Sequence, residues 1–338
     1  MTHPFEVREE FTVDATPDEV WAAITSGPGV DSWLMGRTEI DSASKTSTFH
    51  MFGEVSRSSI TAWEPGHHYA TQEDRNPDGT FMAFEWLIES RDGGGAVVSF
   101  VHSGLLGENW EAEYNGLSVG DHAYMTKLAV YLKHFAPRTA QNSLFLPGPV
   151  TKDSWAALTA AVGVGADAAD GQPARLSVPG IEPVDGTVEF VGAPSFVGMR
   201  TDDAMYMLIH GYNDMVFATA HYFDRDRGVA ELARRVRGLI NAHRPVGAAQ
   251  GLAPDRADRV RVERRLRYVE RDLAQRPRVT LDRLAVPPRP GRGEFEHMVH
   301  HGRDHIGRMP AVYLWPRVSH GHIMRMATDI RSGSGQVR

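Results

Sequence analysis

Short runs of alternating apolar and polar residues fill the N-terminal part of the chain, a pattern typical of antiparallel β-strands. The run FEVREEFTV (5–13) places its apolar side chains on one face and predicts the first strand. Turn-forming Gly, Pro, Asn and Asp residues separate the later strands. Those strands are predicted at 46–52, 54–63, 67–73, 80–90 and 96–104. Together the segments predict one curved antiparallel sheet.

Helices are predicted on either side of these later strands. Thr16 is a suitable N-cap, Pro17 occupies the first helical position, and Glu19 can complete a capping box. The Gly-Pro-Gly sequence at 27–29 is expected to end this helix before a short second one. Apolar residues then recur at spacings of three and four over 110–135, which predicts a long amphipathic helix. A sheet wrapped around one helix leaves an apolar space in which a small molecule would bind.

The start of the first helix is nearly repeated later in the chain. SWAALT (154–159) pairs with VWAAIT (20–25), so that Trp155 aligns with Trp21. Five short candidate strands follow, then a helix over 229–240 with one apolar face, although no opening strand is obvious. So short a match arises by chance in some sequences. A truncated second module is favoured here because the order of elements agrees as well.

Composition places the chain among ordinary soluble proteins, with 41% hydrophobic and 23% charged residues. The absence of cysteine excludes disulfides, thiolate metal sites and cysteine nucleophiles, and it fits a cytoplasmic protein. No apolar run is long enough to span a bilayer, and MTHPFEVREE does not resemble a secretory signal. We therefore expect no membrane association.

Charge separates the C-terminal part from the rest. After residue 228 the chain has 22 Arg, no Lys and 11 acidic residues, a net +11, whereas the preceding part carries −18. A helix with an apolar seam is predicted at 255–275. Contact with nucleic acid, a salt-bridged solvated helix and an extension without function are all compatible with this composition. We favour poor order and no defined role, so we expect domains at 1–139, 140–242 and 243–338, with nucleic acid an unlikely partner.

Few motifs point to specific chemistry. His297, His301 and His305 share one helical face, but the outer two lie about 12 Å apart along a helix, too far to share one metal ion. GVGADA (163–168) follows a predicted helix rather than a strand, so it is not a dinucleotide-binding loop. No P-loop or HExxH motif occurs. We therefore expect no metal and no cofactor.

Large apolar side chains of the N-terminal part are candidates to line a cavity, although most such residues simply fill a core. The candidates are Trp33, Met51, Trp63, Phe84, Trp86, Phe100, Trp110, Tyr114, Met125 and Leu128.

Two polar residues lie among these apolar positions. His102 shares strand parity with Val98 and Phe100, and Asp121 lies on the inner stripe of the long helix. A His and a carboxylate in an apolar pocket could perform acid–base work. The alternative, which we favour on sequence alone, is that Asp121 caps a helix restarted after Gly120 and that His102 points to water.

Three stretches resemble the START-like, helix-grip superfamily, also called SRPBCC. They are TPDEVWAAITSGPGVDSWL (16–34), GEVSRSSITAWEPGHHYA (53–70) and GENWEAEYNGLSVGDHAYMTKLAVYLKHF (107–135). More closely, they are similar to bacterial proteins related to the activator of the 90-kDa heat-shock-protein ATPase. The resemblance covers roughly residues 3–136. It implies an α+β helix-grip fold with a hydrophobic cavity, here followed by a shorter degenerate second module and a tail of low order.

The resemblance names no ligand, because the family is functionally diverse. We expect a small apolar or aromatic molecule to bind in the cavity and consider an enzymatic role the less favoured one. One alternative is a co-chaperone role with a heat-shock-protein ATPase as partner. We discount it because no chaperone-binding domain precedes residue 3. The other is an enzyme of the cyclase or dehydratase kind, with His102 and Asp121 as acid and base.

Overall fold

The computed structural model describes residues 1–51, 54–149, 152–164, 168–192, 196–211, 215–224 and 229–242. The predicted helix at 255–275 and the His-rich stretch at 294–305 lie outside the described residues. We refer to the described residues of 1–139 as the first module and to those of 140–242 as the second module.

The first module contains a seven-stranded antiparallel sheet. Its strands are β1 (His3–Val13), β2 (Arg37–Asp41), β3 (Thr46–Met51), β4 (Glu54–Glu64), β5 (His68–Glu73), β6 (Phe81–Ser90) and β7 (Ala96–Leu106). They lie in the order β1-β7-β6-β5-β4-β3-β2, so the first strand pairs with the last. The α+β helix-grip class predicted from the sequence is confirmed, whereas the edge strand β2 was not predicted.

Two short helices follow β1. Helix α1 (Pro17–Thr25) has the predicted capping box, because the Thr16 hydroxyl accepts from the Glu19 N–H and the Glu19 carboxylate accepts from the Thr16 N–H. The Gly-Pro-Gly sequence does not simply end α1. Instead, it opens helix α2 (Gly27–Val30), whose N-cap is Ser26. The turn that follows buries Trp33, whose indole N–H donates to the Ala23 carbonyl at 3.0 Å.

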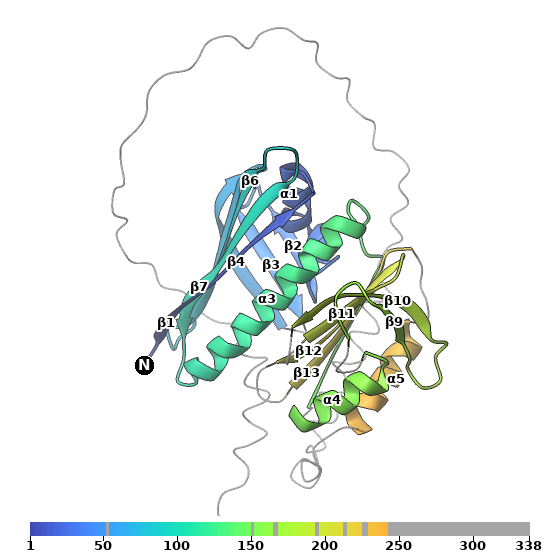
Figure 1. Cartoon of the computed structure of the whole chain (residues 1–338). Coiled ribbons are helices and arrows are strands. Elements are labelled where there is room, and N and C mark those ends of the chain that lie inside the picture. The colour runs from blue at the N-terminus through green and yellow to red at the C-terminus, as the bar shows by residue number, and fades with distance from the viewer. Residues whose placement is uncertain are drawn as a thin grey trace, which may run out of the picture.

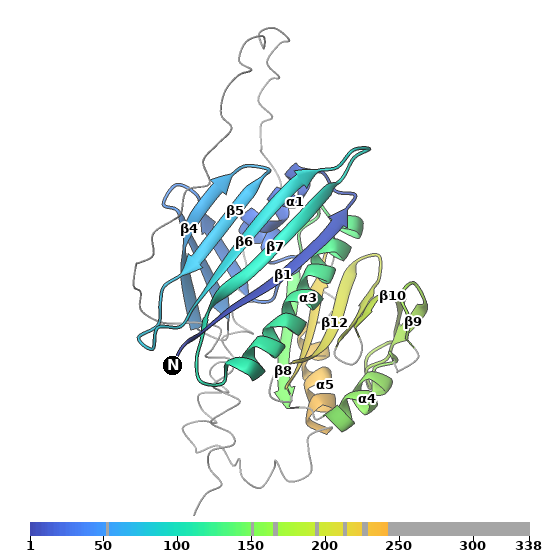
Figure 2. The same cartoon turned by 60° about the vertical axis from the view of Figure 1, so that its left-hand side comes forward.

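The long helix α3 (Trp110–His134) lies across the first sheet and contacts β1 and β7 most closely within it. The second module packs on the other side of α3, so that this helix lies between two sheets (Figure 1, Figure 2). Every turn of α3 in the middle of the helix therefore faces protein on two sides, which explains why both apolar and polar residues of this helix are buried.

The second module repeats the topology of the first with one strand fewer. Its elements are β8 (Asn142–Pro149), α4 (Lys152–Ala161), β9 (Pro173–Leu176), β10 (Val184–Gly192), β11 (Phe196–Arg200), β12 (Ala204–Gly211), β13 (Met215–Tyr222) and α5 (Val229–Ala242). The strand order β8-β13-β12-β11-β10-β9 again pairs the first strand with the last. The opening strand that was not obvious in the sequence is β8, which occupies the place of β1.

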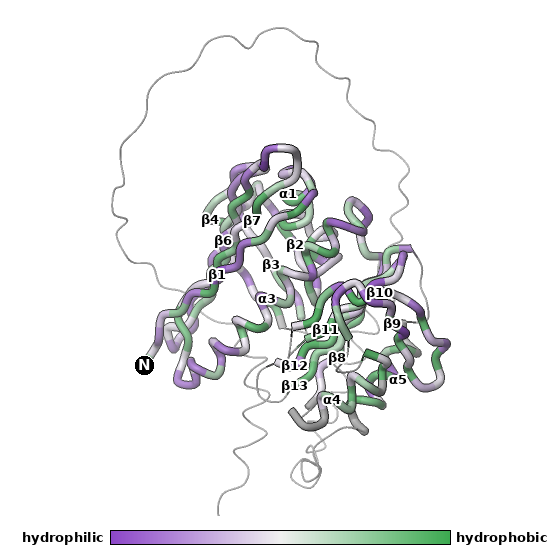
Figure 3. Tube along the Cα trace, viewed as in Figure 1, coloured by the Kyte–Doolittle hydropathy of each residue, from purple (hydrophilic) through white to green (hydrophobic). Residues whose placement is uncertain are grey.

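The second sheet is covered on both faces. One face packs against α4 and α5 through a cluster that includes Leu144, Leu158 and Ile240. The other face packs against α3 and joins the core of the first module through Met205, Met207, Ile209, Phe190 and Phe196. Burial on both faces agrees with the predominantly hydrophobic colour of its strands (Figure 3).

Hydrogen bonds between polar side chains stabilise the interface between the two modules next to α3. The Lys127 ammonium, 1% exposed, donates to the Thr219 hydroxyl at 2.8 Å and to His221 Nδ1 at 3.0 Å. The other ring nitrogen of His221 donates to the Leu34 carbonyl at 2.9 Å. Since Nδ1 accepts and Nε2 donates, this arrangement selects one neutral tautomer of His221. The bonds link α3, β13 and the turn after α2.

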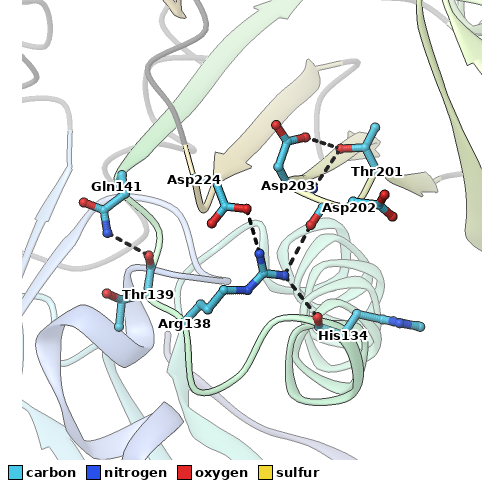
Figure 4. Close-up of polar contacts among 8 residues, drawn as sticks. All are labelled: His134, Arg138, Thr139, Gln141, Thr201, Asp202, Asp203 and Asp224. Carbon is cyan, nitrogen blue, oxygen red and sulfur yellow. Dashed lines mark hydrogen bonds and ion pairs between the residues drawn. The ribbon is translucent and has the colours of Figure 1, made fainter.

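The connection between the modules is held by Arg138 (Figure 4). Its guanidinium donates to the Asp224 carboxylate at 2.9 Å and to the backbone carbonyls of His134 and Asp202 at 3.3 and 3.2 Å. It also lies over the Phe135 and Phe223 rings. One side chain thus joins the end of α3, the turn before β12 and the end of β13.

Within the described ranges, no helix is long and apolar enough to cross a membrane.

Candidate functional site

A cavity of about 240 Å³ lies between the first sheet and α3. Inward-facing residues of β2 to β7 form its floor, and one face of α3 forms its roof. An apolar cavity of about 150 Å³ is large enough to bind benzene, so this one can take a compound of one or two rings.

Aromatic side chains dominate the part of the wall formed by β6, β7 and the turn after α2. Trp86 packs against Trp33 with ring centroids 6.1 Å apart and against Phe100 at 4.5 Å. Phe84 lies beside Phe100, with nearly parallel rings at 6.3 Å. Because Trp33 and Trp86 are buried and fixed by these contacts, their rings provide rigid apolar surface for a flat ligand.

The structure brings six of the ten apolar candidates to this cavity: Trp33, Met51, Phe84, Trp86, Phe100 and Met125. The other four lie elsewhere. Trp63 packs edge-on against Trp21 and Tyr69, and Leu128 is fully buried in the core. Trp110 stacks on His3 near the start of α3, where Tyr114 joins the same small cluster. Helical and strand periodicity places a residue on a face, whereas it does not tell a packed neighbour from a cavity wall.

Two glycines create the space under α3. Gly116 and Gly120 lie one turn apart and line the cavity together with Leu117, Asp121 and Tyr124. A Cβ added at Gly120 would meet no atom within 4 Å, so this position borders open space. Larger side chains at these two positions would occupy the volume that the glycines leave free.

His102 and Asp121 meet inside the cavity. The Nδ1 of His102 on β7 lies 2.8 Å from a carboxylate oxygen of Asp121 on α3, and His102 is 2% exposed. The favoured interpretation from the sequence, in which His102 points to water and Asp121 caps a helix, is wrong. The strand parity of His102 directs it inward, and Asp121 lies on the face of α3 that lines the same cavity.

The surroundings of His102 give the two groups different roles. Its ring is stacked on Phe84 at 4.3 Å and meets the edge of Phe5, and its Nε2 lies 3.3 Å from the Met82 sulfur. The Asp121 carboxylate can only accept, so the Nδ1–H of His102 donates to it, and Nε2 is the ring nitrogen that lies beside the thioether. The Asp121 side chain is the more exposed of the pair, at 16%. Asp121 is therefore the more accessible group of the pair, and its contact with His102 fixes its orientation.

The wall formed by β2 to β5 is more polar than the aromatic wall. Its inward-facing hydroxyl groups belong to Thr38, Ser47, Ser56, Ser58, Tyr69 and Thr71, and its carboxyl group belongs to Glu73. Burial raises the pKa of Tyr69 to about 12, against a lowering contribution from its hydrogen bond with Ser47.

Glu73 is the most unusual member of this wall, because it is a carboxyl group only 4% exposed. The Ser56 hydroxyl donates to its Oε1 at 2.6 Å, and the Met82 backbone N–H also donates to the carboxyl. Its Oε2 has no hydrogen-bond partner among the described residues. Burial raises the pKa of Glu73 to about 7, against the lowering effect of these hydrogen bonds.

Two hydroxyl groups of the wall, those of Thr38 and Tyr124, are also buried without a hydrogen-bond partner in the described part of the chain. Burial raises the pKa of Tyr124, so its phenol remains protonated. Unpaired buried polar atoms are rare in folded proteins, and those of Thr38, Glu73 and Tyr124 all lie in the wall of this cavity. Sequence reasoning missed Thr38, Tyr124 and Glu73. The alternation Tyr69, Thr71, Glu73 along β5 was the available signal for the last of them.

The second module closes part of this cavity. Phe145 of β8 and Phe217 of β13, stacked at 5.4 Å, contribute to the wall together with Ile209 and Gly211 of β12. The core of the second module, between its sheet and α5, leaves a void of only about 50 Å³. A separate pocket of about 860 Å³ in the second module has a more polar lining, which includes Asp185, Arg200 and Asp203. The second module therefore supplies part of the wall of the aromatic cavity and has a pocket of different character of its own.

Among the residues that the structure describes, no group of three His, Asp or Glu side chains is placed to hold a metal ion. His102 and Asp121 supply two potential ligands, but the nearby Met82 thioether is a poor ligand for hard divalent ions.

Comparison with known proteins finds one family whose model matches the first module. Residues 4–128 match the model of a family described as polyketide cyclase / dehydrase and lipid transport. No curated protein sequence matches the chain.

Solved structures similar to this chain include the Aha1 dimer from Colwellia psychrerythraea, at 18% identity over 38% of this chain and 96% of that chain, with a TM-score of 0.32. DynU16, a putative protein of the dynemicin biosynthetic locus, is 16% identical over 71% of this chain and 99% of its own, with a TM-score of 0.34. The di-domain ARO/CYC BexL from the BE-7585A biosynthetic pathway is 11% identical over 72% and 99%, with a TM-score of 0.35. At these sequence identities and TM-scores, the three structures give no information about the function of this chain.

Proposed function

We propose that this protein binds a small, largely apolar aromatic molecule between the first sheet and α3. Support comes from the helix-grip fold and from the match of residues 4–128 to the model of the polyketide cyclase / dehydrase and lipid transport family. The observation that carries the proposal is the cavity of about 240 Å³ with Trp33, Trp86 and Phe100 in its wall. Burial of a flat apolar ligand there contributes about 25 cal/mol for each Å² removed from water.

A cavity-filling substitution tests this proposal. Gly120→Leu places an apolar side chain in the open space under α3 and improves helix propensity by roughly 1 kcal/mol, so the fold is expected to persist. Gly238→Leu is the matched control, because Gly238 lies in helix α5 and a Cβ there also meets no atom within 4 Å. Both variants gain helix propensity, and only the first one fills the cavity.

Binding is measured with a panel of one- and two-ring aromatic compounds, by thermal stabilisation and by quenching of tryptophan fluorescence. Wild type and Gly238→Leu should bind the same compounds, with Trp33 and Trp86 as the reporters in the wall. Gly120→Leu should lose that binding while it keeps its helical circular dichroism. The proposal fails if no compound binds the wild-type protein or if Gly120→Leu binds as well as wild type does.

The contact between His102 and Asp121 supports a second candidate function, catalysis of a proton transfer to or from the bound molecule. A carboxylate held by a buried histidine at 2.8 Å has the geometry of a general base with a positioning partner. In this arrangement Asp121 takes the proton, and His102 stabilises the orientation of its carboxylate. Asp121→Asn should abolish turnover of a bound substrate and leave binding within a fewfold of wild type. Loss of both together would contradict a catalytic role.

The co-chaperone alternative stays a prediction. A pull-down with the purified 90-kDa heat-shock protein, with and without nucleotide, tests it directly.

A further inference from the structure

The proposed ligand is apolar, yet the part of the wall formed by β2 to β5 carries a carboxyl group with one unused oxygen. Glu73 is more than nine-tenths buried, and its Oε1 is already hydrogen-bonded to Ser56 at 2.6 Å. Its Oε2 has no partner in the described residues. Leaving such a group unpaired costs about 1–3 kcal/mol, so the empty site carries a standing penalty that a ligand can remove.

We propose that Glu73 is a second polar anchor of the cavity and that its free oxygen binds a hydroxyl group of the aromatic ligand. The inference rests on the proposed function, since it assumes that an aromatic molecule occupies this cavity. It narrows the ligand class from apolar aromatic compounds in general to phenol-like compounds. Asp121 remains a separate polar point on the roof of the same cavity.

The chemistry of the carboxyl group favours a hydroxyl over other polar groups. A protonated carboxyl offers Oε2 as a donor, whereas a carboxylate offers it only as an acceptor. Because the pKa of Glu73 is raised to about 7, both forms are populated near neutral pH. A ligand hydroxyl donates to one form and accepts from the other, so it satisfies both. A carbonyl or ether oxygen can only accept, and it matches the protonated form alone.

Other ionisable groups face the same space and are included in the design of the test. Among the described residues they are Tyr69 on β5, His102 on β7, and Asp121 and Tyr124 on α3, with Asp74 next in the chain and Arg57 on β4. Comparing wild type with Glu73→Gln cancels their contribution, because Gln keeps the shape and the Ser56 contact but does not titrate.

The experiment measures the dissociation constants of naphthalene, 2-naphthol and 2-methoxynaphthalene at pH 6 and pH 8. Wild type should bind 2-naphthol roughly tenfold or more tightly than naphthalene at both pH values, as expected for one hydrogen bond to a carboxyl group. It should favour 2-methoxynaphthalene over naphthalene only at pH 6. Glu73→Gln should show the same preferences at both pH values, because its amide donates at either one.

Glu73→Leu separates the hydroxyl contact from the apolar contacts. This variant should bind 2-naphthol no more tightly than naphthalene and should keep the wild-type affinity for naphthalene within about threefold, since the aromatic wall is unchanged. If wild type binds naphthalene and 2-naphthol equally, or if Glu73→Leu keeps the preference, the inference is overturned. If none of the three compounds binds wild type, the proposed function fails as well, which is a distinct outcome.

Discussion

Lys127 offers a direct test of how the second module is held against α3. Its ammonium is almost fully buried at the interface, where it donates to Thr219 and His221. Burial lowers the pKa of Lys127 from 10.5 to about 7. In the unfolded chain the same amine keeps its ordinary pKa. Between these two pKa values, the unfolded chain holds a proton on Lys127 that the folded protein does not.

The sign of the effect follows from that difference. Between about pH 7 and 10.5 the unfolded state binds a proton that the folded state does not, so the free energy of unfolding rises with pH, by up to about 1.4 kcal/mol per pH unit. Glu73 has the opposite effect on the pH dependence of the free energy of unfolding, and it acts at lower pH. Its pKa is raised from 4.5 to about 7, so its contribution to stability is lost as pH rises through that range.

The assay is urea unfolding of wild type and Lys127→Met at pH 7, 8 and 9. Met keeps the length of the side chain and removes the titrating group. From pH 7 to pH 9, wild type should gain on the order of 2 kcal/mol more stability than Lys127→Met does. Lys133→Met, on the exposed surface of the same helix, is the matched control and should follow wild type.

Parallel stability curves for wild type and Lys127→Met between pH 7 and 9 would refute the reasoning. That result would mean that the buried amine keeps its proton in the folded protein. A steeper curve for Lys127→Met than for wild type would contradict the sign as well.

Two further substitutions test other parts of the structure. Phe217→Ala removes the ring that stacks on Phe145 in the cavity wall, so 2-naphthol should dissociate roughly two- to tenfold faster in stopped-flow fluorescence, as expected for the loss of an aromatic contact. An unchanged rate would show that the second module does not retain the ligand. Thr16→Ala removes the capping box of α1 and should lower the free energy of unfolding by about 1 kcal/mol, measured by urea unfolding, without changing ligand affinity. A loss of affinity would instead connect this cap to the site.

Most elements of the first module could be predicted because its strands alternate cleanly and its turns contain Gly, Pro and Asn. The two missed strands share a physical cause. The strand β2 has the polar sequence RTEID, and β8 contains Pro147 and Pro149, which argue against a strand by composition. Both lie at the edge of their sheets, where backbone N–H groups need no partner and proline is tolerated.

The candidate site was predicted less completely. The alternation along β7 predicts that His102 points inward, and helical spacing predicts that Asp121 lies on the inner face of α3. Neither pattern predicts how far β7 lies from α3, so the contact between the two side chains could not be predicted. Glu73 was missed because a glutamate near the end of a strand is exposed in most proteins, and its burial here depends on β4 and β6 on either side.

The sequence by itself determined the local structure: the capped helix α1, the alternation of the strands, the long helix α3 and the repeat of the α1 pattern around Trp155 in α4. Each of these depends on neighbours a few residues apart. Only the tertiary structure decided that the second sheet packs on α3, that Phe145 and Phe217 complete the cavity, and that Glu73 retains an unpaired oxygen. These features arise from contacts between segments distant in the chain, and periodicity within a segment carries no information about them.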